Sequence, residues 1–83
     1  MAEEEVGTVS TFFARPVVAG LTLSGGIRVG DTLHIVGHTT DLVQPVESLE
    51  IDRAKVEGAG PGDDVALQVT GQVRDHDLIF REG

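Results

Sequence analysis

Short apolar segments with alternating polar positions run along most of the chain. They are rich in valine, isoleucine, leucine and threonine, which suit the pleated surface of a sheet. In residues 17–23 every odd-numbered position is apolar, so one face of a strand would carry them all. The pattern predicts strands at Val6–Phe13, Val17–Leu23, Thr32–Val36, Leu42–Ile51, Val65–Thr70 and Leu78–Phe80.

The segment Leu42–Ile51 departs from strict alternation. Val43, Leu49 and Ile51 are apolar at odd positions, whereas Val46 is apolar at an even one. Pro45 lies between them and has no N–H to donate to a central ladder. A bulge or bend near Pro45 accounts for both features and would let a sheet curl and close on itself.

Glycines lie between the apolar segments, as turns do in all-β proteins. No stretch keeps a helical period for ten residues; Ser48–Val56 comes nearest and allows one helical turn. We therefore predict an all-β fold, a small closed antiparallel barrel of six to seven strands. Residues 6–83 would form this single domain, and the acidic residues 1–5 a disordered tail.

The chain is strongly acidic, with 6 Lys and Arg against 14 Asp and Glu and a net charge of −8. Binding to nucleic-acid phosphates needs clustered basic residues, and here these are scattered along the chain. The charge thus disfavours RNA partners, excludes DNA and favours a basic protein, such as a ribosomal one. Charge that only confers solubility is the alternative.

The chain has no cysteine, and therefore no disulfide and no thiolate zinc site. No apolar run approaches the roughly 20 residues that span a bilayer. The N-terminus is acidic, unlike a secretory signal peptide. We expect a cytoplasmic protein without membrane contact.

Aspartates precede apolar segments in "VGDTLHIVG" (residues 29–37), "PGDDVALQV" (residues 61–69) and "DHDLIF" (residues 75–80). With "GTVSTFFARP" (residues 7–16) and "VESLEI" (residues 46–51), their order resembles the β-barrel domain 2 of translation GTPases of the elongation factor Tu type. Small free-standing elongation-factor-like barrels with a similar "GHTTD" loop are a nearer resemblance. The resemblance implies a binding role on a protein, a ribosomal surface or a structured RNA.

The phosphate loop of the GTPases is missing from this sequence. The glycine-rich "GAGPGDD" (residues 58–64) lacks the lysine and hydroxyl of that loop. We expect no GTP binding and no cofactor.

The loop "GHTTD" with the nearby Gln44 is the candidate partner-binding site. A turn has no need of imidazole, so His38 at its tip is a candidate recognition residue. The proposed site residues are His38, Thr39, Thr40, Asp41 and Gln44. In the alternative interpretation, the turn has only a structural role, and its threonine and aspartate side chains accept hydrogen bonds from the amides of their own turn.

Two chemical interpretations of the same stretch are disfavoured. A metal held by His34, His38 and Asp41 would need three side chains to converge from a strand and a turn. A threonine nucleophile activated by His38 would lack a water-excluded site. We therefore predict no catalytic residue, no metal and no enzyme activity. The predicted function is a translation-factor-like binding module, with an accessory or regulatory subunit of a larger enzyme as the alternative.

Overall fold

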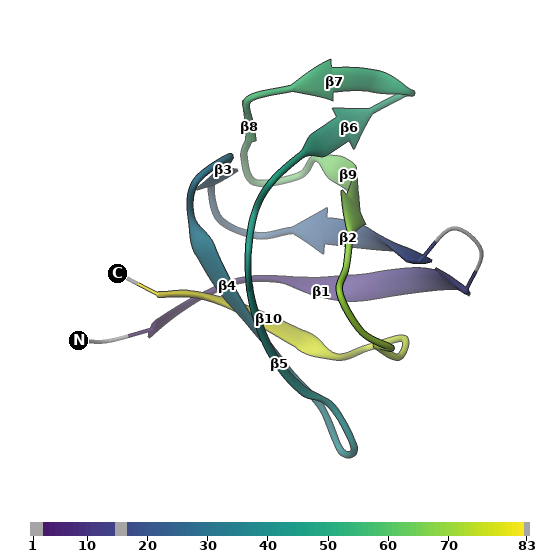
Figure 1. Cartoon of the computed structure of the whole chain (residues 1–83). Helices are drawn as coiled ribbons and strands as arrows, with labels where there is room; N and C mark the ends of the chain where they lie inside the picture. The colour runs from purple at the N-terminus through teal and green to yellow at the C-terminus, as the bar shows by residue number, and fades with distance from the viewer. Residues whose placement is uncertain (1–2, 15–16, 83) are drawn as a thin grey trace.

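The computed structural model describes residues 3–14 and 17–82. Within these ranges the backbone forms strands and turns without a helix, which confirms the all-β prediction (Figure 1). The strands are β1 (Glu3–Ala14), β2 (Val17–Leu23), β3 (Ile27–Arg28), β4 (Thr32–Val36), β5 (Asp41–Pro45), β6 (Leu49–Ile51), β7 (Ala54–Val56), β8 (Gly58–Ala59), β9 (Asp64–Gln68) and β10 (Leu78–Glu82). No helix in this part of the chain is long and apolar enough to cross a membrane.

Eight of the strands form one curled antiparallel sheet in the order β5-β4-β10-β1-β2-β9-β6-β7, and β3 pairs with β8 in a small second sheet. The predicted closure into a barrel of six to seven strands is wrong, because in the described residues the backbone ladder ends at β5 and at β7. Where β5 passes the end of β9, the Gln44 side chain bridges the gap in place of a ladder. Its Nε2 donates to the carbonyl of Gln68 at 3.0 Å, and its Oε1 accepts from the amide of Thr70 at 2.9 Å.

The predicted strand Leu42–Ile51 is interrupted after Pro45, where β5 ends. Val46 turns inward and is bound through its backbone to Gly30 and Asp31. The chain then enters a hairpin of β6 and β7, in the region where the sequence pattern allows one helical turn. Asp52 and Arg53 form its turn with φ of 52° and 68°, the left-handed conformation that a type I′ hairpin requires.

The core is formed by the inward-facing positions of the strands, as the alternation predicts. Leu21, Leu33, Ile35, Leu67 and Ile79 have no exposed surface. Burying a side chain of this size contributes about 1.5–3 kcal/mol, so this apolar cluster is the main source of stability. The adjacent phenylalanines face opposite ways: Phe12 packs against the core, whereas Phe13 is 57% exposed.

The acidic N-terminus differs from the expected disordered tail. Glu3–Glu5 begin strand β1, where they pair with residues 80–82 of β10. Met1 and Ala2 lie outside the described residues. A backbone ladder with β10 therefore holds a segment whose composition alone indicates a solvated tail.

Candidate functional site

The loop "GHTTD" is the turn between β4 and β5. The Gly37 amide donates to the Thr40 carbonyl at 2.8 Å, which leaves His38 and Thr39 exposed at the tip. Thr40 is 6% exposed and therefore part of the interior. Of the predicted partner-binding residues in this turn, only His38, Thr39 and Asp41 present their side chains to solvent.

The fifth predicted partner-binding residue, Gln44, is only 3% exposed. Its side-chain amide is hydrogen-bonded to the backbone of Gln68 and Thr70, as described above. Gln44 is thus placed to hold the fold together, and its side chain is not accessible to a partner. In the sequence, Gln44 is simply a polar residue next to a turn, and nothing there indicates that its side chain is buried and bridges two strands.

The sequence did not indicate that Asp77 lies against Gly37 of the β4–β5 turn. Asp77 is 5% exposed, and its Oδ2 accepts from the backbone amide of Arg74 at 2.8 Å. A Cβ placed on Gly37 would lie 1.9 Å from Asp77 Oδ1. A side chain at position 37 would therefore displace either the Asp77 carboxylate or the turn itself.

His34 on β4 is held between two carboxylates on the outside of the sheet. Its Nδ1 lies 2.8 Å from Glu3 Oε2, and its Nε2 lies 2.6 Å from Asp41 Oδ1. Since both ring nitrogens face carboxylate oxygens, the doubly protonated imidazolium is the form that satisfies both contacts. This arrangement joins the start of β1 to β4 and β5.

The side chains that come together around His34 are not the three named in the sequence analysis as a disfavoured metal site. Ligand atoms of Glu3, His34 and Glu82 lie within 4.8 Å of one another, whereas His38 is not part of this group. Imidazole and carboxylates are ligand types that zinc accepts. Both nitrogens of His34 are already bound to carboxylates, however, so the arrangement is explained by a proton on the ring.

The hydrogen bond to Asp41 raises the pKa of His34 above its usual value of 6.5, and the hydrogen bond to Glu3 raises it further. A raised pKa in the folded state means that the protonated ring favours folding. This contribution is fully present below the pKa of unfolded histidine and is lost as the pH rises through the folded pKa.

We expect the wild-type chain to lose stability between pH 6 and pH 9, and the His34→Gln variant to lose less over the same range. The glutamine cannot gain or lose a proton in this window, whereas the imidazolium loses its charge. Urea unfolding at both pH values measures the difference. An identical loss in the two proteins would show that the contacts to Glu3 and Asp41 do not favour the protonated ring.

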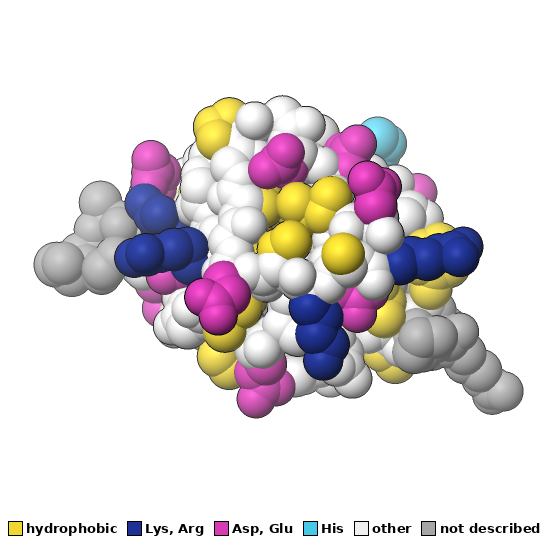
Figure 2. Space-filling view, turned by 90° about the horizontal axis from the view of Figure 1, so that it is seen from above, with side chains coloured by type: hydrophobic (Ala, Val, Ile, Leu, Met, Phe, Trp, Pro, Cys, Tyr) yellow, Lys and Arg dark blue, Asp and Glu magenta, His cyan; other side chains and the backbone are white. Residues whose placement is uncertain are grey.

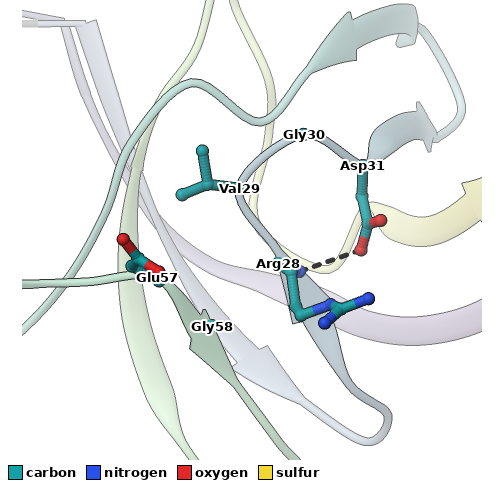
Figure 3. A pocket seen from close by; sticks show the side chains of 6 residues that line it. All are labelled: Arg28, Val29, Gly30, Asp31, Glu57 and Gly58. Atoms are coloured by element: carbon teal, nitrogen blue, oxygen red, sulfur yellow. Dashed lines mark hydrogen bonds between the residues drawn. The ribbon is translucent and has the colours of Figure 1, made fainter.

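A separate hollow lies at the end of the molecule where β3 and β8 meet. It has a volume of about 670 Å³ and is lined by Arg28, Val29, Gly30, Asp31, Glu57 and Gly58 (Figure 3). Asp31 Oδ2 accepts from the Arg28 amide at 2.8 Å, which fixes the turn from β3 to β4. The hollow is open to solvent and presents a guanidinium, two carboxylates and one exposed valine.

A second hollow of about 340 Å³ adjoins the first and shares Val29 and Glu57 with it. Its other lining residues are Glu47, Ser48, Leu49, Lys55 and Val56. Figure 2 looks down on this end of the molecule and shows apolar side chains in its middle, with charges of both signs around them. Neither lining includes a histidine, and the side-chain hydrogen bonds of residues 3–14 and 17–82 join no base to Ser48. The two hollows together suit contact with a polar and apolar surface.

Solved structures show which fold carries these surfaces. The chain superposes with a TM-score of 0.90 on the C-terminal domain of a Geobacillus thermoleovorans protein assigned to the U32 peptidases. The match covers 96% of this chain and 93% of that one, at 18% sequence identity. The selenomethionine variant of that domain gives a TM-score of 0.88 and covers 95% and 99% of the two chains, also at 18% identity. The chain therefore has the fold of that C-terminal domain.

A curated relative is similar in sequence as well. An uncharacterized protease of Methanocaldococcus jannaschii is 34% identical over 77 residues, which are 92% of this chain and 19% of that protein. The chain thus spans about a fifth of the length of the relative that it matches. No protein-family model matches the chain.

These similarities correct the expected relationship to translation factors. The relatives are named as peptidases, so the resemblance to domain 2 of the translation GTPases and the translation-module function inferred from it are wrong. The resemblance relied on Gly-Asp turns before apolar strands. Such turns suit any small antiparallel sheet, because glycine adopts positive φ and aspartate binds a nearby amide. Their order therefore did not discriminate between families.

Proposed function

We propose that this chain is a non-catalytic accessory domain of a larger enzyme related to the U32 peptidases, and that it acts by contact with the enzyme body. The main support for this proposal is the extent of the sequence match, because nearly the whole chain corresponds to only a fifth of the relative named as a protease. The matching solved structure is a C-terminal domain studied on its own. The remaining four-fifths of the relative would then supply the chemistry.

The geometry of the described side chains supports an accessory role. The histidine with the most contacts, His34, binds two carboxylates on an open sheet face. A peptidase nucleophile needs a base within hydrogen-bond reach and donors that stabilise an oxyanion. The hollows at the β3–β8 end instead present scattered charges around apolar side chains, which is the composition of a contact surface.

The purified chain should hydrolyse neither casein nor a mixed peptide library above the rate of a buffer blank. The reason is that the side-chain hydrogen bonds of the described residues join no hydroxyl to a histidine. The one hydroxyl among them that donates to a carboxylate, Thr22 to Asp64 at 3.1 Å, is exposed to solvent, so the chemistry would belong to the enzyme body. Mass spectrometry of the peptide library after prolonged incubation measures this. Cleavage that co-purifies with the chain and disappears on substitution of one of its residues would overturn the proposal.

A further inference from the structure

The outer face of β1, β10, β4 and β5 is defined by the strand registers. One row across it contains Glu5, Phe80, His34 and Val43, each paired with the next. The row on one side contains Thr8, Leu78, Val36 and Asp41, and the row on the other side Glu3, Glu82, Thr32 and Pro45. The neighbouring positions Leu33, Ile35 and Ile79 are buried, so these three rows point away from the core. We call this surface the outer face.

Four apolar side chains lie around His34 on the outer face, two of them exposed and two partly buried. Val43 is 53% exposed and Leu78 is 39% exposed, and Val36 and Phe80 lie between them in the register. Leu78 pairs with Val36 and stands two residues from Phe80, whereas Val43 pairs with His34 and neighbours Val36 only diagonally. The four residues therefore form one apolar patch around that histidine. A large apolar residue exposed alone is ordinary, whereas exposed apolar residues that gather on one face with polar residues around them are a candidate interaction surface.

Carboxylates surround this patch. Glu3, Glu5, Asp41 and Glu82 stand in its three rows, and none of the row positions is Lys or Arg. Glu3 and Asp41 share the charge of His34, whereas the ion pairs of the described residues include neither Glu5 nor Glu82. The outer face therefore combines apolar residues grouped around the paired His34 with negative charge at its margin.

We propose that the outer face binds a single segment of a partner protein in which apolar side chains are flanked by lysines or arginines. Charge complementarity selects this occupant. A second copy of this chain, with its net charge of −8, would bring carboxylates against carboxylates, and a nucleic acid would be repelled in the same way.

The size of the outer face also fits one segment. With strands about 4.8 Å apart and residues about 3.4 Å apart, its rows span roughly 14 Å in each direction. A stable protein–protein interface usually covers about 800 Å² on each partner, several times this footprint. One strand or one helix of a partner would cover it. This inference rests on the proposed function for the identity of the partner, which would be the enzyme body. The chemistry of the binding segment is inferred from the outer face alone.

The probe is a synthetic peptide of alternating leucine and lysine, titrated into the isotopically labelled chain and followed by NMR. We expect amide shifts concentrated on β10, β4 and β5. A Val43→Asp/Leu78→Asp variant should bind about tenfold more weakly or worse, because two charges replace apolar contacts. A peptide with glutamate in place of lysine should not bind.

The matched control is Phe13→Asp/Val17→Asp, which adds the same charge at residues that are 57% and 38% exposed and lie outside the three rows. It should change the affinity by less than about twofold. Equal weakening in both variants, shifts centred elsewhere, or equal binding of the glutamate peptide would overturn the proposal. The shift map of the wild-type chain decides the matter even if a variant fails to fold. Since no enzyme is present, failure here would leave the accessory-domain function standing with a different contact surface.

Discussion

Replacing Gly37 with alanine should lower the free energy of unfolding by about 3 kcal/mol. The new Cβ would lie 1.9 Å from Asp77 Oδ1, so either the β4–β5 turn or the buried carboxylate must move. Moving the carboxylate breaks its hydrogen bond with the Arg74 amide and leaves a buried polar group without a partner. A domain of this length has a total stability of about 4–12 kcal/mol, so a large share would be lost. Urea unfolding measures the change.

The matched control for this substitution is Gly60→Ala. A Cβ on Gly60 would meet no atom within 4 Å, so its effect should stay within about 0.5 kcal/mol. In a double-mutant cycle, the Asp77→Ala substitution should remove most of the additional cost of Gly37→Ala, because the clashing carboxylate is gone. Additive losses in the cycle, or a Gly37→Ala variant as stable as the control, would contradict the role given to this pair.

Replacing Gln44 with alanine should also cost about 3 kcal/mol. The buried amide bridges β5 to the carbonyl of Gln68 and the amide of Thr70, and the Thr70 hydroxyl lies 3.3 Å from the same Gln44 oxygen. Alanine would leave these backbone groups without partners where the sheet has no ladder, and would open a cavity. Thermal or urea unfolding reports the loss.

Gln68→Ala is the control for the Gln44 substitution, because the Gln68 side chain is exposed and only its backbone carbonyl takes part in the bridge. This variant should remain within about 0.5 kcal/mol of wild type. If Gln44→Ala were no more destabilising than Gln68→Ala, the bridge between β5 and β9 would not contribute to stability.

The positions of the longer strands could be predicted from the sequence because their side chains alternate with period two, whereas β3, β7 and β8, of two or three residues each, were not predicted. Residues 17–23 and 32–36 form β2 and β4 with the predicted bounds, and Leu21, Leu33 and Ile35 are buried as the alternation requires. Closure of the sheet could not be predicted in the same way. It depends on which part of the chain the end strand β5 meets, and there the Gln44 side-chain amide joins β5 to the end of β9 without backbone pairing.

The candidate site was predictable only where its contacts are local. The "GHTTD" turn lies where the sequence places it, with His38 and Thr39 at the tip. The neighbours of this turn come from distant parts of the chain: Asp77 lies against Gly37, and Glu3 reaches His34. A single sequence contains no periodic feature that pairs such residues. The outer face likewise exists only through the register of four strands.

The accessory-domain proposal is tested most directly by affinity capture from the native cell with the wild-type chain, followed by quantitative mass spectrometry. We expect enrichment of a polypeptide similar to the part of the Methanocaldococcus protease that lies outside the matched residues. Its recovery should fall with the Val43→Asp/Leu78→Asp variant and persist with Phe13→Asp/Val17→Asp. Capture of ribosomal proteins or RNA without any such enzyme body would contradict the account.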